Sequence, residues 1–374
     1  MNPKRSSDHP RIELLGIGSA RHRAFRAKLE EALQALHLSI PIQEVSEISD
    51  LLQYDISGIP ALVINGKVVF QKVLPSVEDF KIVLSVLLQP DNGHFELQQV
   101  VVPTDFSELA DNAYQFALDL AREQSASVQL IHIHQPTAAV ASMPQPASDQ
   151  VDLLNQKRSL MRRRTSGEEK DSRYPNPEGV RVEDLIITGS VVEELKSLSR
   201  LGQTNLIVMG TTGENRANGR LWGSISSTVA RKAACPVLLV PPFVRYQGFS
   251  RIVYASNFQP GEEHIWPQVM EWAARFGADV HFVHIEEDEL HGYSVQRTSS
   301  GYFPNAGRPL FHLATVDSND MLDGLSQYAE DQQADLLIMA TPHRRFLEDW
   351  FHRSATRRMI FNTAIPLMVM HFDA

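Results

Sequence analysis

The sequence predicts an α/β protein made of three successive domains, each a sheet with helices packed against it. Short apolar runs alternate with amphipathic helical segments along the whole chain, which is typical of sheets built from parallel strands. The pattern of the middle third also recurs in the last third at constant offsets. With 374 residues the chain is long enough for three domains of ordinary size.

The composition indicates a soluble globular protein. Hydrophobic residues make up 43% of the chain and charged residues 21%. The formal net charge of -10 argues against nucleic acid as the main partner, because phosphate backbones need basic surfaces. No apolar run approaches the roughly 18 residues of a membrane helix, and the basic N-terminus lacks the apolar core of a signal peptide. A cytoplasmic protein without membrane insertion is therefore expected. A single cysteine, Cys235, excludes an intrachain disulfide.

Residues 11–90 are predicted to form the first domain. The pair Asn65-Gly66 lies between two apolar runs, which is a strong signal for a hairpin closed by a type I′ turn. The expected order of elements is βαβαββα. Its members are a strand at 11–18, a helix at 23–36, a strand at 40–46, a short helix at 47–54, the hairpin at 59–70 and a helix at 77–88.

This order, with Pro60 just before the hairpin strand, resembles the thioredoxin-like fold of small thiol reductases. That family carries a Cys-x-x-Cys pair at the start of its first helix, and Ser19 and His22 stand at those positions here. Neither residue can form a disulfide, so dithiol exchange is excluded. The resemblance makes Pro60 the counterpart of the family's cis-proline, although a simple tight turn also explains it. We interpret residues 11–90 as a redox-dead interaction or dimerisation domain.

The segment 206–240 carries the strongest motif of the chain. An apolar run ends in Gly210, Gly213 follows after two residues, and Gly223 and Ser224 follow after nine more. A helical segment and a second apolar run come next. Glycines let a backbone approach a ligand closely, and a helix N-terminus favours negative charge. The pattern therefore indicates a phosphate site.

Together with strands at 100–106 and 128–134, this loop resembles the ATP-binding branch of the universal stress protein family, whose loop is Gly-x2-Gly-x9-Gly-Ser/Thr. The resemblance covers residues 97–242. It implies a doubly wound parallel sheet, of the adenine nucleotide alpha hydrolase-like type, that binds ATP with or without Mg²⁺. It further implies that Asp105 contacts the ribose and the Ile133 backbone the adenine. The expected nucleotide site consists of Pro103, Thr104, Asp105, Ile133, Gly210, Gly213, Gly223 and Ser224.

Structural explanations stay open for parts of this site. Asp105 and Glu108 fit a capping box, so that Asp105 could serve only to cap a helix. The glycines could serve only a turn. Arg216 and Arg220 lie inside the loop and could reach phosphates, but solvated surface charge explains them as well.

No metal site is expected. His132 and His134 share one face of a predicted strand, but no third ligand has convincing spacing. A packed histidine is the better interpretation of His132, because it recurs as His284 in the repeat. Cys235, between a helix end and a buried strand, is interpreted as a small apolar residue.

Residues 250–372 repeat the middle domain in degraded form. His284 follows His132 by 152 residues and Asn257 follows Asp105 by the same interval, whereas Ala340 follows Gly210 by 130. The second copy is thus 22 residues shorter between its second and fourth strands. We expect it to bind no ATP and to pair with the middle domain through their last strands, as family members commonly pair. Its loop positions are Ala340, His343, Arg353 and Ser354, in a region that also carries Arg344, Arg345, Arg357 and Arg358.

Residues 135–178 are long for a connection between two strands. They contain a basic cluster from Lys157 to Arg164, and residues 151–164 could form a short basic helix. A mobile, solvated loop is the default expectation for such a segment.

The sequence predicts an ATP-binding stress-response regulatory protein with one live site, whose occupancy signals to an unidentified protein partner. The alternative is a nucleotide-independent interaction scaffold. Catalysis is not evident, because no P-loop lysine follows the glycines, although the resemblance allows slow ATP hydrolysis and a homodimer. A thiol-redox enzyme is a third interpretation, and it requires Cys235 to act as a monothiol.

Overall fold

The computed structural model of the chain describes residues 10–88, 97–135, 147–166, 175–202, 204–211, 224–287, 293–301, 311–342 and 365–372. The chain divides into two compact units. The first unit combines residues 1–94 with 256–319, and the second combines 95–255 with 320–374.

The N-terminal part of the first unit confirms the predicted order βαβαββα. Its four strands form one sheet in the order β2-β1-β3-β4, in which only β1 and β2 are parallel. The elements are β1 (Ile12–Leu15), α1 (Ala20–Ala35), β2 (Ile42–Val45), α2 (Ile48–Leu51), β3 (Ala61–Ile64), β4 (Lys67–Gln71) and α3 (Val77–Leu88).

Local sequence signals explain these elements. Asn65 and Gly66 both have positive φ, 51° and 80°, which confirms the type I′ turn between β3 and β4. Ser19 is the N-cap of α1, and its Oγ accepts a hydrogen bond from the backbone N–H of His22. The peptide bond between Ile59 and Pro60 is cis.

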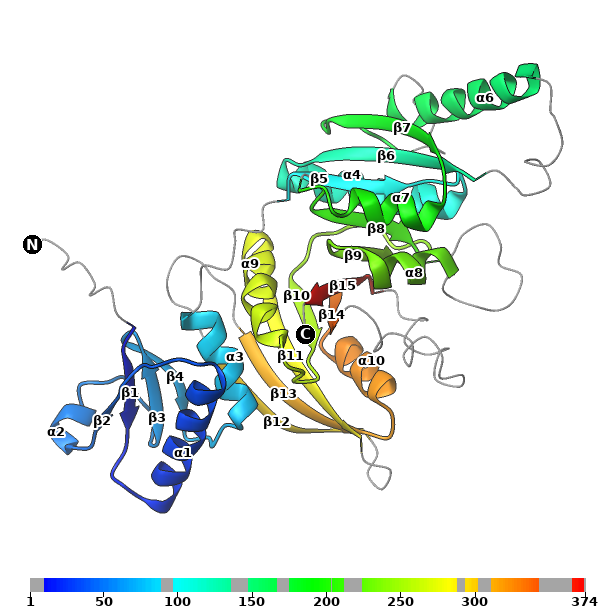
Figure 1. The fold of residues 1–374 in the computed structure, drawn as a ribbon. Coiled ribbons are helices and arrows are strands. Elements are labelled where there is room, and N and C mark those ends of the chain that lie inside the picture. Colours follow the sequence, from blue (N-terminus) through cyan, green and yellow to red (C-terminus); the bar gives the residue numbers. More distant parts are fainter. Residues whose placement is uncertain are drawn as a thin grey trace, which may run out of the picture. The chain divides into compact units, whose positions relative to one another are not determined.

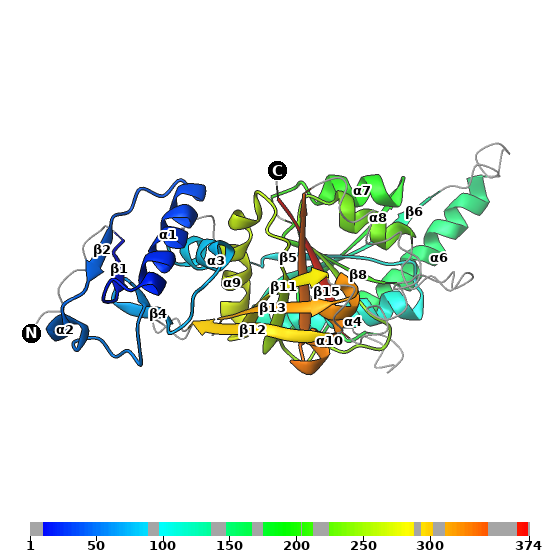
Figure 2. The same cartoon turned by 90° about the horizontal axis from the view of Figure 1, so that it is seen from below.

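The rest of the first unit contributes three strands that follow one another in the order β12-β13-β11, together with α9 and the 3₁₀ turn η1. In Figures 1 and 2, α3 lies next to α9, and it contacts α9 and η1 as well as α1. The elements are η1 (Glu262–His264), α9 (Trp266–Phe276), β11 (Asp279–Glu287), β12 (Ser294–Gly301) and β13 (Phe311–Ser318).

The expectation of a purely parallel sheet in the C-terminal segment is wrong at this edge. β11 and β13 are parallel, but β12 runs antiparallel to β13. The connection from β11 to β13 is too short to hold a helix as long as that in the middle segment. An edge strand gives the backbone of this short connection hydrogen-bond partners within the sheet.

Eight strands of the second unit follow one another in the order β10-β14-β15-β9-β8-β5-β6-β7. All neighbours are parallel except β15 and β9, the last strands of the C-terminal and middle segments. Pairing of these two last strands within the chain was predicted. The strands are β5 (Gln99–Pro103), β6 (Ser127–His134), β7 (Val182–Thr188), β8 (Leu206–Gly210), β9 (Val237–Val240), β10 (Arg251–Ala255), β14 (Leu336–Pro342) and β15 (Leu367–Phe372).

The central strands of this sheet are fully buried apolar runs, as expected for parallel strands covered by helices. Val100, Val101 and Val102 of β5 are each 0% exposed. α4 packs against β5, β6, β8 and β9, and α6 against β7 (Figure 1). The helices are α4 (Glu108–Gln124), α6 (Ala147–Thr165), α7 (Val191–Leu198), α8 (Ser224–Lys232) and α10 (Met321–Asp331). Within the described residues no helix combines the length and apolarity needed to span a membrane.

The middle and C-terminal segments repeat each other's backbone contacts at the offsets of 152 and 130 seen in the sequence. The backbone N–H of Gln98 donates to Asn205 Oδ1 at 2.7 Å, and that of Ser250 donates to Asp335 Oδ2 at 2.7 Å. In the same way, the N–H of Thr104 reaches the carbonyl of Ile131 at 2.8 Å. The N–H of Ser256 reaches the carbonyl of Val283 at 2.8 Å.

Candidate functional site

The strand order places the predicted site residues at one edge of the sheet. Starting from β5, the next strands along the chain, β6 and β7, are added on one side of it. The following strands, β8 and β9, are added on its other side. The order therefore reverses between β5 and β8, whose parallel pairing aligns Val100 with Leu206. In open α/β sheets, ligands bind outside the carboxyl ends of the strands at such a switch point. Asp105 follows β5 and Gly210 ends β8, so two residues far apart in sequence meet there.

Asp105 is exposed at this edge. Its Oδ1 accepts hydrogen bonds from the backbone N–H of Ser107 at 3.0 Å and from the Ser107 hydroxyl at 2.6 Å. The alternative of a capping box formed by Asp105 and Glu108 is wrong. Since α4 begins at Glu108, the N-cap is Ser107, whose Oγ accepts from the N–H of Ala110. The Asp105 carboxylate instead closes a turn before the helix and faces solvent.

Pro103 and Thr104 fix the strand end that presents Asp105. Pro103 is the last residue of β5. Thr104 is buried, and its Oγ1 accepts a hydrogen bond from the N–H of Phe106 at 3.0 Å. Phe106 has a φ of 69°, an uncommon conformation for a bulky residue. The loop is therefore held in one shape by contacts on both of its sides.

Ile133 lies in β6 beyond the point where β5 has ended. The last β5–β6 pair is Pro103 with Ile131, and the Ile131 carbonyl points toward β5, where it accepts from the N–H of Thr104. Peptide groups two residues apart along a strand point the same way. The Ile133 peptide therefore also faces the β5 side, at a place where no strand residue stands opposite. This is the geometry expected of a backbone contact to a base.

His132 is part of the support beneath the loop. Its Nδ1 lies 2.8 Å from the Thr104 carbonyl, and its ring lies 4.4 Å from the ring of Phe106. Burial lowers the pKa of His132 below its ordinary value, with a further contribution from the charge of Lys157. Among the described residues, no group of three or more His, Cys, Asp or Glu side chains is placed to hold a metal ion. The contacts of His132 are those of a packed histidine.

The loop that was predicted to hold phosphates is described only at its two ends. The Gly210 carbonyl accepts a hydrogen bond from the hydroxyl of Ser226 at 2.8 Å, which ties the end of β8 to the first turn of α8. Ser224 opens that helix and is exposed. Residues 212–223 lie outside the described residues, and with them Gly213, Gly223, Arg216 and Arg220. Ser226 was not predicted, although its position two residues into the helix could have suggested it.

Part of the segment between β6 and β7, residues 147–165, is a helix where a loop was expected. α6 spans Ala147–Thr165, longer than the predicted basic helix. Met161 is fully buried and Arg164 is only 4% exposed. The expectation of a mobile, solvated loop is wrong for the helix, because one of its predicted basic residues points inward. The guanidinium of Arg164 pairs with both carboxylate oxygens of Asp111 at 2.5 and 2.7 Å.

Arg164 also reaches the loop of the candidate site. Its Nη2 donates to the Phe106 carbonyl at 3.2 Å, and its Cζ lies 5.2 Å from the centre of the Phe106 ring. Burial raises the pKa of Asp111, although the guanidinium acts in the opposite direction. α6 is thereby joined to α4 and to the loop that carries Asp105.

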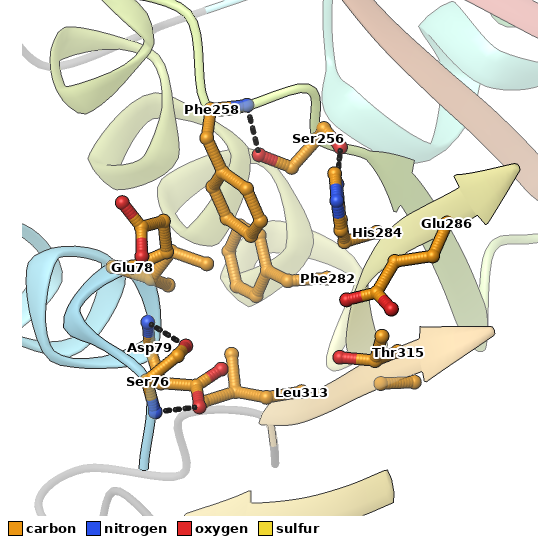
Figure 3. Close-up of a pocket in the computed structure, with 12 residues that line it drawn as sticks. Ser76, Glu78, Asp79, Ser256, Phe258, Phe282, His284, Glu286, Leu313 and Thr315 are labelled. Carbon is orange, nitrogen blue, oxygen red and sulfur yellow. Dashed lines mark hydrogen bonds between the residues drawn. The ribbon is translucent and has the colours of Figure 1, made fainter. Parts of the chain in front are cut away.

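In the first unit, residues 256–258 form a loop of the same shape. His284 Nδ1 lies 3.1 Å from the Ser256 carbonyl, and the rings of Phe258 and His284 are 4.5 Å apart. Figure 3 shows these residues lining a cavity of about 280 Å³ together with Glu78 of α3. Ala340, the counterpart of Gly210, lies in β14 of the second unit. His343, Arg353 and Ser354 lie outside the described residues, as do Arg344, Arg345, Arg357 and Arg358.

In the loop 256–258, a buried carboxylate of the same chain accepts hydrogen bonds from two of the loop's donors. Glu262 is 2% exposed. It accepts hydrogen bonds from the Ser256 hydroxyl at 2.7 Å and from the N–H of Asn257 at 3.2 Å. A carboxylate of the protein therefore already stands against a backbone N–H of this loop.

The thiol interpretation does not fit the geometry. Cys235 is buried, and burial raises the pKa of its thiol to about 12. A thiolate nucleophile needs a lowered pKa and access to solvent. Ser19 and His22, at the positions of the expected cysteine pair, are a helix cap and a buried ring.

Comparisons with known proteins match two parts of the chain. Residues 96–241 match the model of the universal stress protein family, and residues 11–85 match the model of the thioredoxin domain. A universal stress protein of Methanocaldococcus jannaschii is 28% identical over 149 residues, which are 40% of this chain and 85% of that protein. One of Bacillus subtilis is 24% identical over 149 residues, 38% of this chain and 97% of that protein.

One solved structure extends the likeness in fold to most of the chain. The crystal structure of a universal stress protein from Archaeoglobus fulgidus has a TM-score of 0.54 at 16% identity, and covers 75% of this chain and 98% of that chain. A universal stress protein in complex with cAMP has a TM-score of 0.30 at 25% identity, and covers 39% and 97%. The chain thus has an α/β fold with a thioredoxin-like N-terminal domain and a universal stress protein domain of parallel-sheet type.

Proposed function

We propose that this chain is an ATP-binding regulatory protein of the universal stress type, with one live nucleotide site in its middle segment. The observation that carries the proposal is the switch point between β5 and β8. It brings an exposed carboxylate, Asp105, and the glycine at the end of β8 to the same edge of the sheet. A ribose hydroxyl suits the first and a phosphate the second.

Each predicted contact has a place in this proposal. Asp105 accepts from the ribose, the Ile133 peptide faces the adenine, and Pro103 and Thr104 hold the strand end. Ser224 presents a hydroxyl at the N-terminus of α8. Gly213 and Gly223 complete the phosphate loop by the sequence motif alone. Mg²⁺ would accompany the phosphates rather than a protein cluster.

We further infer that residues 250–372 are a degenerate second copy that binds no ATP. Glu262 supports this, because its carboxylate takes up a backbone N–H of the loop 256–258. Asn257 replaces the ribose-binding carboxylate, and Ala340 replaces the glycine at the strand end. A Cβ there narrows the approach of a phosphate to the backbone.

The first test is the number of ATP molecules bound per full-length chain, measured by calorimetry with and without Mg²⁺. We expect one site in the wild type and none in Gly213→Asp, since a carboxylate in the loop repels the phosphates. The internal repeat provides a matched control, His343→Asp. It introduces the same aspartate at the equivalent position of the second copy and should keep one site.

Three outcomes contradict parts of the proposal. Two sites in the wild type would show that the second copy is live. Loss of ATP binding in His343→Asp, with binding kept in Gly213→Asp, would show that the nucleotide site lies in the second copy and not in the middle segment. No binding of ATP or cAMP at millimolar concentration would favour the alternative, a nucleotide-independent protein-interaction scaffold.

A further inference from the structure

The cavity of about 280 Å³ in the first unit is lined by the start of α3 on one side and by the strands β11 and β13 on another (Figure 3). Phe282, His284 and Glu286 alternate along β11, so their side chains share one face of the sheet. In the register of the parallel pair, Thr315 of β13 stands beside His284 and belongs to the same face. A volume of this size suits a ligand of a few heavy atoms.

The charged groups that line this cavity are carboxylates. Glu78, Asp79 and Glu286 line it, and no lysine or arginine does so among the described residues. Asp79 is used within the helix, because it exchanges hydrogen bonds with Ser76 at 2.8 and 3.1 Å across the first turn of α3. In the part of the chain that the structure describes, the carboxylates of Glu78 and Glu286 make no hydrogen bond or ion pair. The first turn of a helix favours Glu78, but this does not explain Glu286.

A buried hydroxyl gives a second, independent indication of a ligand. Thr315 is only 9% exposed, and within the described residues its hydroxyl makes no hydrogen bond. Figure 3 shows its oxygen pointing into the cavity, on the same side as Glu286. Buried hydroxyls are normally paired, because an unpaired one has lost its hydrogen bonds to water. A bound hydrogen-bond donor would satisfy this one.

Apolar side chains separate the two carboxylates. In Figure 3, Phe258 and Phe282 lie between Glu78 on the helix side and Glu286 on the strand side. Phe282 and Ile82 are each only 2% exposed. A ligand that spans the cavity therefore meets a carboxylate at each end and apolar surface in its middle. The faces of aromatic rings also attract cations.

We propose that this cavity binds a small aliphatic diamine, with its ammonium groups toward Glu78 and Glu286 and its hydrocarbon chain against Phe282. An ammonium group donates three hydrogen bonds, so at the strand side it can donate to the Glu286 carboxylate and to the Thr315 hydroxyl. A phosphate or carboxylate ligand would meet like charge at both ends. The cavity lies in the first unit, and its ligand is independent of the nucleotide site proposed in the second.

The inference is tested by calorimetry of the full-length chain at low salt, without nucleotide and with 1,4-diaminobutane as the probe. We expect Glu78→Gln and Glu286→Gln each to weaken its binding about three- to tenfold, since each removes the charge opposite one ammonium group. Butylamine, with one ammonium group, should bind more weakly than the diamine, and succinate should not bind. Glu287→Gln is the matched control, because Glu287 is the next residue of β11, is exposed and points to the opposite face.

Thr315→Val separates a contact to the ligand from a structural role. Valine keeps the shape of the side chain and removes an unpaired hydroxyl, so the free variant should melt at or above the temperature of the wild type. Its affinity for 1,4-diaminobutane should nevertheless fall about two- to fivefold. Thr315→Ser retains a hydroxyl and should bind the diamine as the wild type does. A lower melting temperature with unchanged affinity in Thr315→Val would overturn the role of this hydroxyl.

Three results would overturn the inference as a whole. They are no binding of 1,4-diaminobutane at millimolar concentration, equal affinity for succinate, and equal affinity of the wild type, Glu78→Gln and Glu286→Gln. Equal weakening by Glu287→Gln and Glu286→Gln would show that the net charge of the chain attracts the diamine and that the cavity does not. Gly213→Asp should bind the diamine as the wild type does, so that a failure of the nucleotide proposal is distinguished from a failure of this one.

Discussion

Two loops of the chain, residues 104–106 and 256–258, have the same backbone geometry and different surroundings. Phe106 and Phe258 both have positive φ, 69° and 53°, and each ring rests on a buried or half-buried histidine. The first loop carries an exposed carboxylate, Asp105, whereas a backbone N–H of the second loop donates to the buried carboxylate of Glu262. The fold therefore sets the backbone shape of both loops. We expect nucleotide binding to depend on the side chains around each loop, because these differ.

The helices beside the two loops sharpen this comparison. α6 presents Lys157 and Arg164 to Phe106, and α3 presents Glu78 and Asp79 to the cavity beside Phe258. Opposite charges at equivalent places predict opposite preferences for an anion.

The largest effect is expected from Arg164→Ala. The change leaves the carboxylate of Asp111 buried without its partner and releases the Phe106 carbonyl. Removing one member of a buried ion pair costs about 3–5 kcal/mol, and we expect the urea midpoint of the second unit to fall accordingly. Because the loop loses its tie to α6, ATP affinity should fall as well.

The control for this variant is Arg162→Ala, two residues earlier on α6 at an exposed position. It removes the same charge without touching Asp111, and its stability should stay within about 0.5 kcal/mol of the wild type. Equal loss in both variants would mean that α6 is held by its overall charge and that the pair with Asp111 adds nothing.

An intermediate effect is expected at the two aromatic rings. Phe106→Ala and Phe258→Ala each remove a half-buried ring and its histidine contact, at a cost of about 1–3 kcal/mol. We expect similar losses in urea unfolding, because the two loops are alike. Only Phe106→Ala should also weaken ATP, since it alone borders the proposed site. Weakening of ATP by Phe258→Ala would break the distinction between the two copies.

Phe106→Gly separates the ring from the backbone. Glycine adopts positive φ without the steric cost that alanine pays, so this variant should be more stable than Phe106→Ala by up to about 1 kcal/mol. A glycine variant as unstable as the alanine variant would show that the backbone of this loop is not under that constraint.

Much of the fold could be predicted because its signals are local. Apolar runs predicted the central strands, and Asn65-Gly66 predicted the hairpin. The offset of 152 residues predicted two loops that share a backbone hydrogen bond, Thr104 to Ile131 and Ser256 to Val283. The strand ends of the site followed from the same pattern, since carboxyl ends of parallel strands share one edge. Gly213 and Gly223 remain predictions.

What could not be predicted depends on contacts between distant residues. A basic cluster at 157–164 is consistent with a solvated loop. Arg164 turns inward because of distant partners, the half-buried carboxylate of Asp111 and the Phe106 carbonyl. Glu262 has no sequence pattern that marks it as the group that fills the second loop. The edge strand β12 likewise depends on its pairing with β13 rather than on its own residues.

The smallest effect is the pH dependence contributed by His132. Burial lowers its pKa, so the folded protein keeps the ring neutral while the unfolded chain takes up a proton near pH 6.5. Its contribution to stability is complete above that pH and declines as the pH falls through it toward the lower folded value. We expect the urea midpoint of the wild type to drop between about pH 7.5 and pH 5.5. The drop should be smaller in His132→Asn, whose amide nitrogen takes the place of Nδ1 and can still donate to the Thr104 carbonyl. Parallel losses in the two proteins would assign the acid sensitivity to other groups and leave the ring beneath Phe106 with a packing role alone.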